Sequence, residues 1–215
     1  MPTLIAVAHG TRSPAGQAQI RDLAARVAAR RPGLDVRLCY ADVQEPRVAE
    51  VAPLLPDAVV VPLLLSAGYH VRVDIADAVA GLPTPVTRPL GPDDVLRDSL
   101  LRHLPPADAV VLAAAGSSDL AWRADVEALA AGLGGHAGYV SGPGPRVPDV
   151  VAGLRARGAR RIAIAAYLLA DGLFYRTLTQ AGADHVTPPL CADPTVTDLV
   201  LERYDSVLTT AAARL

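Results

Sequence analysis

Two histidines in the first third of the chain each follow a short apolar run that ends in small residues. The first run reads Leu4-Ile-Ala-Val-Ala-His9-Gly-Thr-Arg12, and the second reads Val59-Val-Val-Pro-Leu-Leu-Leu-Ser-Ala-Gly68-Tyr-His70. Neutral imidazole is a common ligand of divalent transition metals, and it can also transfer protons near neutral pH. Two imidazoles that face each other could therefore hold a metal ion or share proton transfer.

The elements that carry these histidines are expected to bring them together. A run rich in Val, Ile and Leu that ends in glycine is typical of a strand buried on both faces. We predict strands over residues 3–8 and 58–64, which places His9 and His70 at strand carboxyl ends. In a flavodoxin-like sheet of order 2-1-3-4, ligands bind in the crevice between strands 1 and 3. Both histidines would then flank one crevice.

Strands and helices alternate through the first half of the chain. The apolar pattern predicts further strands over 35–40 and 86–89, and helices over 15–30, from 46, over 73–80 and over 93–104. This alternation indicates βαβ units, and hence a parallel sheet with right-handed crossovers.

The same pattern then starts again after a proline-rich linker at 103–108. Residues 108–116 repeat the first strand, and residues 160–172 repeat the third strand with Gly172 in the place of Gly68. A closing amphipathic helix is expected over 195–215. The sequence therefore predicts an α/β fold of two tandem flavodoxin-like, Rossmann-like parallel-sheet halves related by internal duplication, 1–106 and 107–215.

The second half lacks the polar residues of the first. Ala115, Ser141 and Phe174 stand where the first half has His9, Asp42 and His70. We expect the first half to carry the active site, and the second half to be a degenerate repeat that forms the other wall of the cleft.

Three motifs in this order resemble the sirohydrochlorin chelatases of the CbiX and SirB type, in their two-half single-chain form. They are His9-Gly-Thr-Arg12, Tyr40-Ala-Asp42-Val-Gln-Glu-Pro46 and Pro62-Leu-Leu-Leu-Ser-Ala-Gly-Tyr-His70-Val-Arg-Val-Asp74-Ile. These class II chelatases are lyases that insert a metal ion into a modified tetrapyrrole without ATP. The resemblance implies a class II chelatase fold and insertion of Fe(II) into sirohydrochlorin to give sirohaem. Insertion of Co(II) for cobalamin biosynthesis is the alternative.

The resemblance also implies roles for individual residues. His9 and His70 would be catalytic, because imidazole can hold the ion loosely and accept the pyrrole protons. Asp42 would join them as a third metal ligand, although the family more commonly carries Glu there and the shorter Asp could act through water. The alternative for Asp42 is a turn-forming residue that bonds to the backbone two residues on. The metal is a substrate in this scheme, and no permanently bound cofactor is expected.

Substrate-binding roles are expected for residues next to the histidines. Arg12 and Arg72 would pair with the carboxylates of sirohydrochlorin, an octacarboxylate, because arginine binds carboxylates through two parallel hydrogen bonds; exposed surface arginines are the alternative. Ser66, Gly68 and Tyr69 would shape the loop that approaches the macrocycle.

Composition excludes several other classes of protein. The formal net charge is −2 with no block of basic residues, and aromatic residues make up 4%, so a nucleic-acid surface is not expected. No apolar run approaches the ~20 residues that span a bilayer, and the start of the chain has no leader pattern, so we expect a cytoplasmic protein without a membrane partner. Cys39 and Cys191 lack metal-ligand spacing.

Two other functions stay open from the sequence. A protein that binds and delivers a metal or tetrapyrrole without turnover would keep the same histidines. A flavodoxin-like mononucleotide binder is disfavoured, because the loop after the first strand lacks a Ser/Thr/Gly-rich phosphate cradle. A monomer is preferred, since the duplication supplies in one chain what a dimer of single halves would supply.

Overall fold

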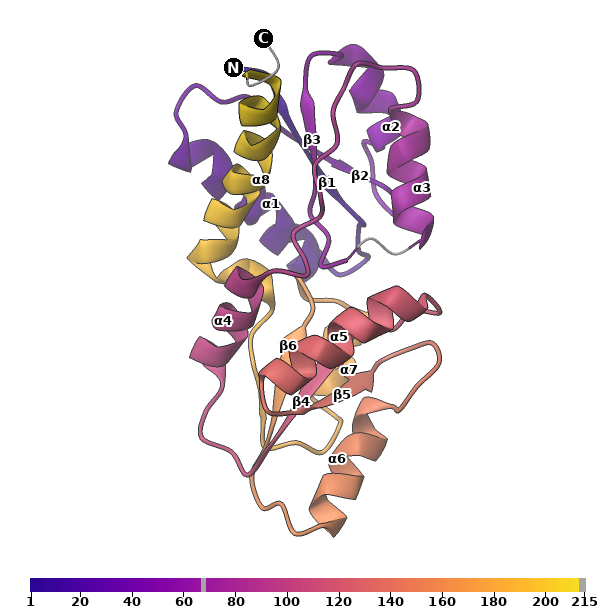
Figure 1. Ribbon diagram of the computed structural model, residues 1–215, viewed down its shortest axis with the longest axis vertical. Coiled ribbons are helices and arrows are strands. Elements are labelled where there is room, and N and C mark those ends of the chain that lie inside the picture. The colour runs from indigo at the N-terminus through magenta and orange to yellow at the C-terminus, as the bar shows by residue number, and fades with distance from the viewer. Residues whose placement is uncertain (67–68, 213–215) are drawn as a thin grey trace. The chain divides into compact units, whose positions relative to one another are not determined.

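The structure is a computed structural model that describes residues 1–66 and 69–212, with the side chains of residues 69–72 and 210–212 outside this description. The chain forms two compact units (Figure 1). The first unit comprises Met1–Gly91 and Asp193–Leu215, and the second comprises Pro92–Ala192. Both units are α/β, which confirms the predicted fold class.

A three-stranded parallel sheet forms the centre of the first unit. Its order is β2-β1-β3, made of β2 (Val36–Tyr40), β1 (Leu4–Ala8) and β3 (Val59–Pro62). Every residue of β1 and β3 is buried. This explains why both strands are continuous apolar runs, since helices cover both faces of the sheet. The predicted order of the first three strands is confirmed.

Helices cover the two faces of this sheet. Helices α1 (Pro14–Arg30) and α8 (Pro194–Ala212) lie on one face, and α2 (Val48–Val51), the 3-10 turn η1 (Ala52–Leu54) and α3 (Tyr69–Ala78) lie on the other (Figure 1). The core under α2 and α3 is apolar and includes Ile5, Val7, Cys39, Val48, Val60 and Ile75. Loops that leave the carboxyl edge of the sheet, between these two layers, can carry a site.

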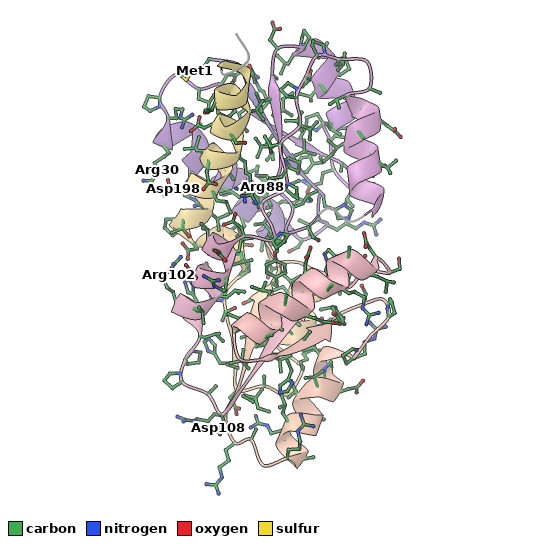
Figure 2. All side chains as sticks on the ribbon, in the orientation of Figure 1. Met1, Arg30, Arg88, Arg102, Asp108 and Asp198 are labelled. Carbon is green, nitrogen blue, oxygen red and sulfur yellow. The ribbon has the colours of Figure 1, made fainter. Side chains whose placement is uncertain are left out.

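Helix α8 is fixed to the first unit by apolar and charged contacts. Leu199 and Tyr204 are buried, and Arg30 of α1 donates two hydrogen bonds of 2.8 and 2.9 Å to Asp198 of α8 (Figure 2). Arg203 is also buried, and its guanidinium donates to the carbonyl oxygens of Pro89 and Leu90 at 3.0 Å each. Through Arg203, helix α8 therefore fixes the backbone of Pro89 and Leu90, at the end of the segment that follows β3.

The second unit repeats the architecture around a four-stranded parallel sheet. Its order is β5-β4-β6-β7, made of β5 (His136–Tyr139), β4 (Ala109–Ala114), β6 (Ile162–Tyr167) and β7 (His185–Val186). The remaining elements are α4 (Asp94–His103), α5 (Leu120–Gly132), α6 (Val147–Ala156), α7 (Leu173–Leu178), and the 3-10 turn η2 (Leu190–Ala192). Trp122 of α5 is buried.

Three features differ from the sequence-based expectations. Helix α3 begins at Tyr69 rather than at residue 73, because residues 69–72 contain no proline or glycine to prevent the helix from starting earlier. The fourth strand expected at 86–89 is reduced to a single bridge between Val60 and Val86, since prolines at 85 and 89 cannot donate backbone hydrogen bonds. Packing also does not follow the expected boundary at 106/107: α4 packs on β6 and η2 of the second unit, and α8 packs on α1 and β3 of the first.

Candidate active site

His9 lies at the carboxyl edge of the first sheet, directly after β1, with its side chain exposed. The next residue, Gly10, has φ 98°, and a Cβ at this position would collide with the carbonyl oxygen of Asp42. Glycine meets both demands without strain. The two loops therefore approach closely, and the backbone N–H of Asp42 donates to the carbonyl oxygen of His9 over 3.0 Å.

Asp42 follows β2, the strand next to β1, and one of its carboxylate oxygens is held by two donors. Oδ1 accepts from the Val43 N–H at 2.7 Å and from Arg47 Nη1 at 3.2 Å. The Val43 N–H, Arg47 and the charge of His9, in that order, hold the pKa of the Asp42 carboxyl below its ordinary value. Oδ2 has no hydrogen-bond partner within the described part of the chain. Asp42 Oδ1 therefore bonds to the backbone one residue on rather than two, and Oδ2 is available as a ligand.

The loop that follows β2 is also tied to the loop that follows β1. The Thr11 N–H donates to Gln44 Oε1, and Gln17 Nε2 donates to the Thr11 carbonyl, both over 2.9 Å. Ser13 caps α1 by accepting a hydrogen bond from the Gly16 N–H at 3.4 Å. Arg12 lies between these anchored residues with its side chain exposed, and among the described residues it has no ion-pair partner. It is therefore available to an acidic ligand.

His70 is the second residue of α3, not a loop residue at the end of its strand. Its side chain lies outside the described residues, as do those of Tyr69 and Arg72, and Gly68 lies outside them altogether. Ser66 is half-buried shortly after β3. The structure therefore brings together His9 and Asp42, while the approach of His70 to them stays a prediction.

The described His9–Asp42 pair can perform limited chemistry by itself. An imidazole and a carboxylate oxygen could bind a divalent ion weakly, and the imidazole could accept a proton. Across the side chains that the structure describes, no group of three or more His, Cys, Asp or Glu residues is arranged to hold a metal. Cys39 is buried in the core below this edge, so its thiol is not a ligand here.

Sequence reasoning missed Arg47 and Val43. Arg47 donates to Asp42, and Val43 has φ 66°, a left-handed conformation that is strained for a β-branched residue. The repeat contained a signal for both. At the same offset of 99 residues that relates Tyr40 to Tyr139, Arg47 corresponds to Arg146 and Val43 to Gly142.

The second unit retains the backbone arrangement of this site without its polar side chains. Gly116 has φ 103°, and a Cβ there would collide with the carbonyl oxygen of Ser141. The Ser141 N–H donates to the carbonyl oxygen of Ala115 over 2.8 Å, as Asp42 does to His9. The Ser141 hydroxyl donates to the same carbonyl over 2.7 Å. The duplicated loops therefore share their geometry, and only the first pair presents an imidazole and a carboxylate.

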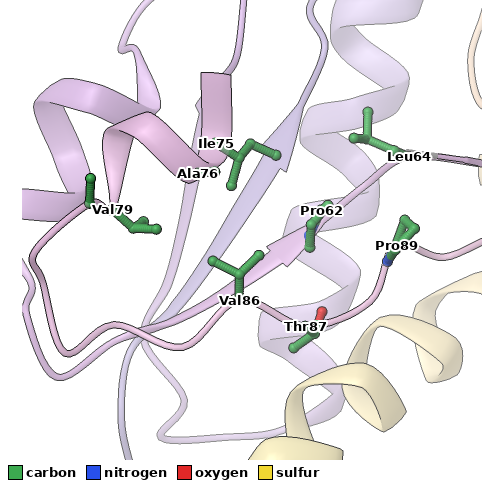
Figure 3. Close-up of a pocket in the computed structure, with 9 residues that line it drawn as sticks. Pro62, Leu64, Ile75, Ala76, Val79, Val86, Thr87 and Pro89 are labelled. Carbon is green, nitrogen blue, oxygen red and sulfur yellow. The ribbon is translucent and has the colours of Figure 1, made fainter. Parts of the chain in front are cut away.

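A separate cavity of about 370 Å³ lies beside α3 in the first unit (Figure 3). Its lining side chains come from the end of β3 and the residue two positions after it, from α3 and the two residues that follow it, and from the segment 86–89. They are Pro62, Leu64, Ile75, Ala76, Val79, Ala80, Val86, Thr87 and Pro89. None of the expected site residues lines it. The lining is apolar apart from Thr87, whose hydroxyl donates to the carbonyl oxygen of Arg88 over 2.8 Å, so the cavity is not a metal site.

No helix in the described part of the chain combines the length and apolarity needed to cross a bilayer.

Comparisons with known proteins agree with the duplicated fold. The CbiX family model matches residues 3–106 and again residues 109–207. No curated protein matches the chain significantly.

Several solved structures share the fold over nearly the whole chain. SirB from Bacillus subtilis with Fe3+ has a TM-score of 0.76 at 20% identity, covering 94% of each chain. The sirohydrochlorin chelatase SirB from Bacillus subtilis subspecies spizizenii in complex with cobalt has a TM-score of 0.73 at 20% identity, over 95% of this chain and 94% of that one. CbiX, described as the terminal enzyme for siroheme biosynthesis in denitrifying bacteria, has a TM-score of 0.70 at 23% identity, over 95% and 98%.

Proposed function

The chain belongs to the CbiX family, and on that premise we propose that it is a sirohydrochlorin chelatase, a lyase that inserts a divalent metal ion into sirohydrochlorin without ATP. One observation carries the proposal. His9 and Asp42 follow adjacent parallel strands and are joined by a 3.0 Å backbone hydrogen bond, which supports a joint role for their imidazole and carboxylate at the edge of the sheet where α/β proteins bind ligands.

Metal insertion requires groups that hold the ion weakly and a base for the macrocycle. The ion enters as two pyrrole N–H protons leave, so the total charge is conserved. Asp42 Oδ2 and the His9 imidazole bind the incoming ion, and His70 supplies a second imidazole from the first turn of α3. The two imidazoles accept the pyrrole protons and pass them to water.

Basic and small residues around the histidines are proposed to bind the macrocycle. Arg12, exposed beside His9, and Arg72, on the same helix as His70, would pair with its peripheral carboxylates. Ser66 and Gly68, together with Tyr69 at the start of α3, would form the surface over which the ring lies. The second half would hold no metal centre of its own, because Ala115 and Phe174 cannot ligate an ion.

Fe(II) is the proposed metal, with sirohaem as the product. Cobalt is the second candidate, since imidazole and carboxylate ligands accept both ions and solved relatives of the same fold are described with Fe3+ and with cobalt. We also propose a monomer that acts in the cytoplasm, where the free thiols of Cys39 and Cys191 stay reduced.

The test is an anaerobic visible-absorbance time course of sirohydrochlorin with Fe(II), Co(II) or Ni(II), with and without the protein. The wild-type chain should accelerate insertion over many turnovers, and His9→Ala and His70→Ala should each remove most of this rate. His136→Ala, which changes an exposed histidine on β5, is the matched control and should keep it.

The rival function makes a different prediction in the same assay. A protein that only binds metal or tetrapyrrole would bind sirohydrochlorin but give no rate above the uncatalysed reaction when substrate is in excess. That result would refute the chelatase assignment, whereas wild-type turnover in His9→Ala would refute the catalytic role of His9.

A further inference from the structure

We propose that Arg47 is a positioning residue for the metal ion: it fixes the Asp42 carboxylate through Oδ1 and so leaves Oδ2 as the oxygen that binds the ion. This inference rests on the proposed function, because it assumes that Asp42 takes part in metal binding. It concerns a residue that sequence motifs did not identify.

The Arg47 guanidinium is itself held in place by three acceptors. Nη1 donates to the carbonyl oxygen of Ala41 and to Asp42 Oδ1, each at 3.2 Å, and Nε donates to Glu45 Oε1 at 3.1 Å. The Arg47 N–H adds a 2.9 Å hydrogen bond to Glu50 Oε2 at the start of α2. A planar guanidinium can satisfy several acceptors at fixed angles. Arg47 is thus a rigid support for the loop 41–47.

The charges of the loop 41–47 allow the Arg47 guanidinium to lie beside Asp42, the proposed metal ligand. Arg47 alone would repel an incoming ion, but Glu45 pairs with its Nε side, and Asp42 adds a second carboxylate. One cation and two carboxylates leave this loop with a formal charge of −1. The Arg47 contact is confined to Oδ1, and Asp42 Oδ2 is free of hydrogen bonds within the described residues.

The duplication separates the structural role of Arg47 from the role proposed here. In the second unit, Arg146 Nη1 donates to the carbonyl oxygen of Val140 over 2.7 Å, which matches the contact between Arg47 and Ala41. No carboxylate is present there, because Ser141 replaces Asp42 and its hydroxyl turns to Ala115. The backbone contact is therefore common to both loops, whereas the carboxylate contact is specific to the loop beside His9.

The experiment measures Co(II) affinity and steady-state insertion kinetics on the full-length protein. Arg47→Gln should weaken Co(II) binding about tenfold or more, as loss of a residue that orients a metal ligand does. It should raise the KM for metal and leave the KM for sirohydrochlorin unchanged. Arg47→Lys should recover part of the Co(II) affinity, because it keeps a cation near Oδ1. Arg146→Gln is the matched control: it loses the equivalent backbone contact and should leave Co(II) affinity unchanged.

A double-mutant cycle with Asp42→Asn decides whether Arg47 acts through Asp42. If it does, Arg47→Gln should cause no further loss of Co(II) affinity in the Asp42→Asn background. An equal loss in both backgrounds, an equal loss from Arg146→Gln, or wild-type Co(II) affinity in Asp42→Asn would overturn the proposal. Failure of the proposed function is distinguishable, since it would appear as absent insertion by the wild-type chain while Co(II) affinities can still be measured.

Discussion

The backbone N–H of Asp42 donates a 3.0 Å hydrogen bond to the carbonyl oxygen of His9. This bond joins the two candidate metal ligands through their main chains, so their spacing does not depend on flexible side-chain contacts. It requires that Gly10 have no side chain, because a Cβ there would meet the carbonyl of Asp42.

Gly10→Ala should therefore remove metal binding and destabilise the protein. The positive φ alone costs an alanine about 1–2 kcal/mol, and the collision adds to this.

Gly116→Ala should show a similar loss of stability and unchanged Co(II) affinity, since it creates the same collision in the unit without ligands. Gly81 has φ 77°, and a Cβ there would meet open space. Gly81→Ala should therefore lower the free energy of unfolding only by the amount that the positive φ costs. Urea unfolding and Co(II) titration of the three variants test this, and intact Co(II) binding in Gly10→Ala would contradict it.

Val43 stores backbone strain that the second unit avoids. Val43 has φ 66°, and its counterpart Gly142 has φ 70°. Val43→Gly should stabilise the protein by about 1 kcal/mol, because the relief of strain exceeds the extra entropy that glycine loses on folding. The reverse change, Gly142→Val, should destabilise it. Free energies of unfolding from urea titrations measure both, and a destabilised Val43→Gly would show that contacts of the half-exposed Val43 side chain outweigh the strain.

The buried thiol of Cys39 should be unreactive in the native protein. Burial raises the pKa of this thiol from 9.0 to about 12, so the folded state favours the protonated form. Its contribution to stability is complete below pH 9 and falls as the pH rises toward 12, because only the unfolded chain ionises in that range. In a Cys191→Ala background, labelling by a disulfide reagent at pH 8 should follow unfolding. Fast labelling under native conditions would contradict this burial.

Helix α8 should be held mainly by its apolar side chains. Leu199 is 1% exposed, and Leu199→Ala should cost about 2–5 kcal/mol through lost burial and a new cavity. Arg30→Ala should cost much less, since the Arg30 and Asp198 side chains are 52% and 55% exposed and water screens such pairs. Thermal and urea unfolding compare the two. An equal loss from Arg30→Ala would mean that the ion pair, rather than the core, holds the helix.

The sequence predicted the strands and the meeting of His9 with Asp42 for a simple reason. Continuous apolar runs mark buried parallel strands, and parallel strands bring the residues that follow them to one edge. Arg47 could not be found in the same way, because its role depends on how the loop 41–47 folds back over Asp42. The start of α3 was also misjudged: an apolar run followed by Tyr69 and His70 fits either a loop or a helix.

Helix α4 lies at the end of the first repeat but packs in the second unit, and α8 lies at the end of the second repeat but packs in the first. The sequence pattern does not predict this exchange of α4 and α8, for a different reason. The spacing of Leu96 and Leu100 in α4, or of Val196 and Leu199 in α8, shows that one face of each helix is buried. It does not show which sheet buries it. Tertiary packing determines the sheet: α4 packs in the second unit, and α8 packs in the first.

This exchange means that a cut in the linker at 106 would not produce two independent folds. The fragment 1–106 would contain the first sheet without α8, and its α4 would lack β6 and η2 to pack on. The fragment 107–215 would contain the second sheet without α4, and its α8 would lack α1 and β3 to pack on. Each piece should fold poorly alone, and the two should complement each other when mixed. By the same reasoning, an ancestral chain with a single repeat could bury its last helix in this arrangement only by packing it against the sheet of a second copy.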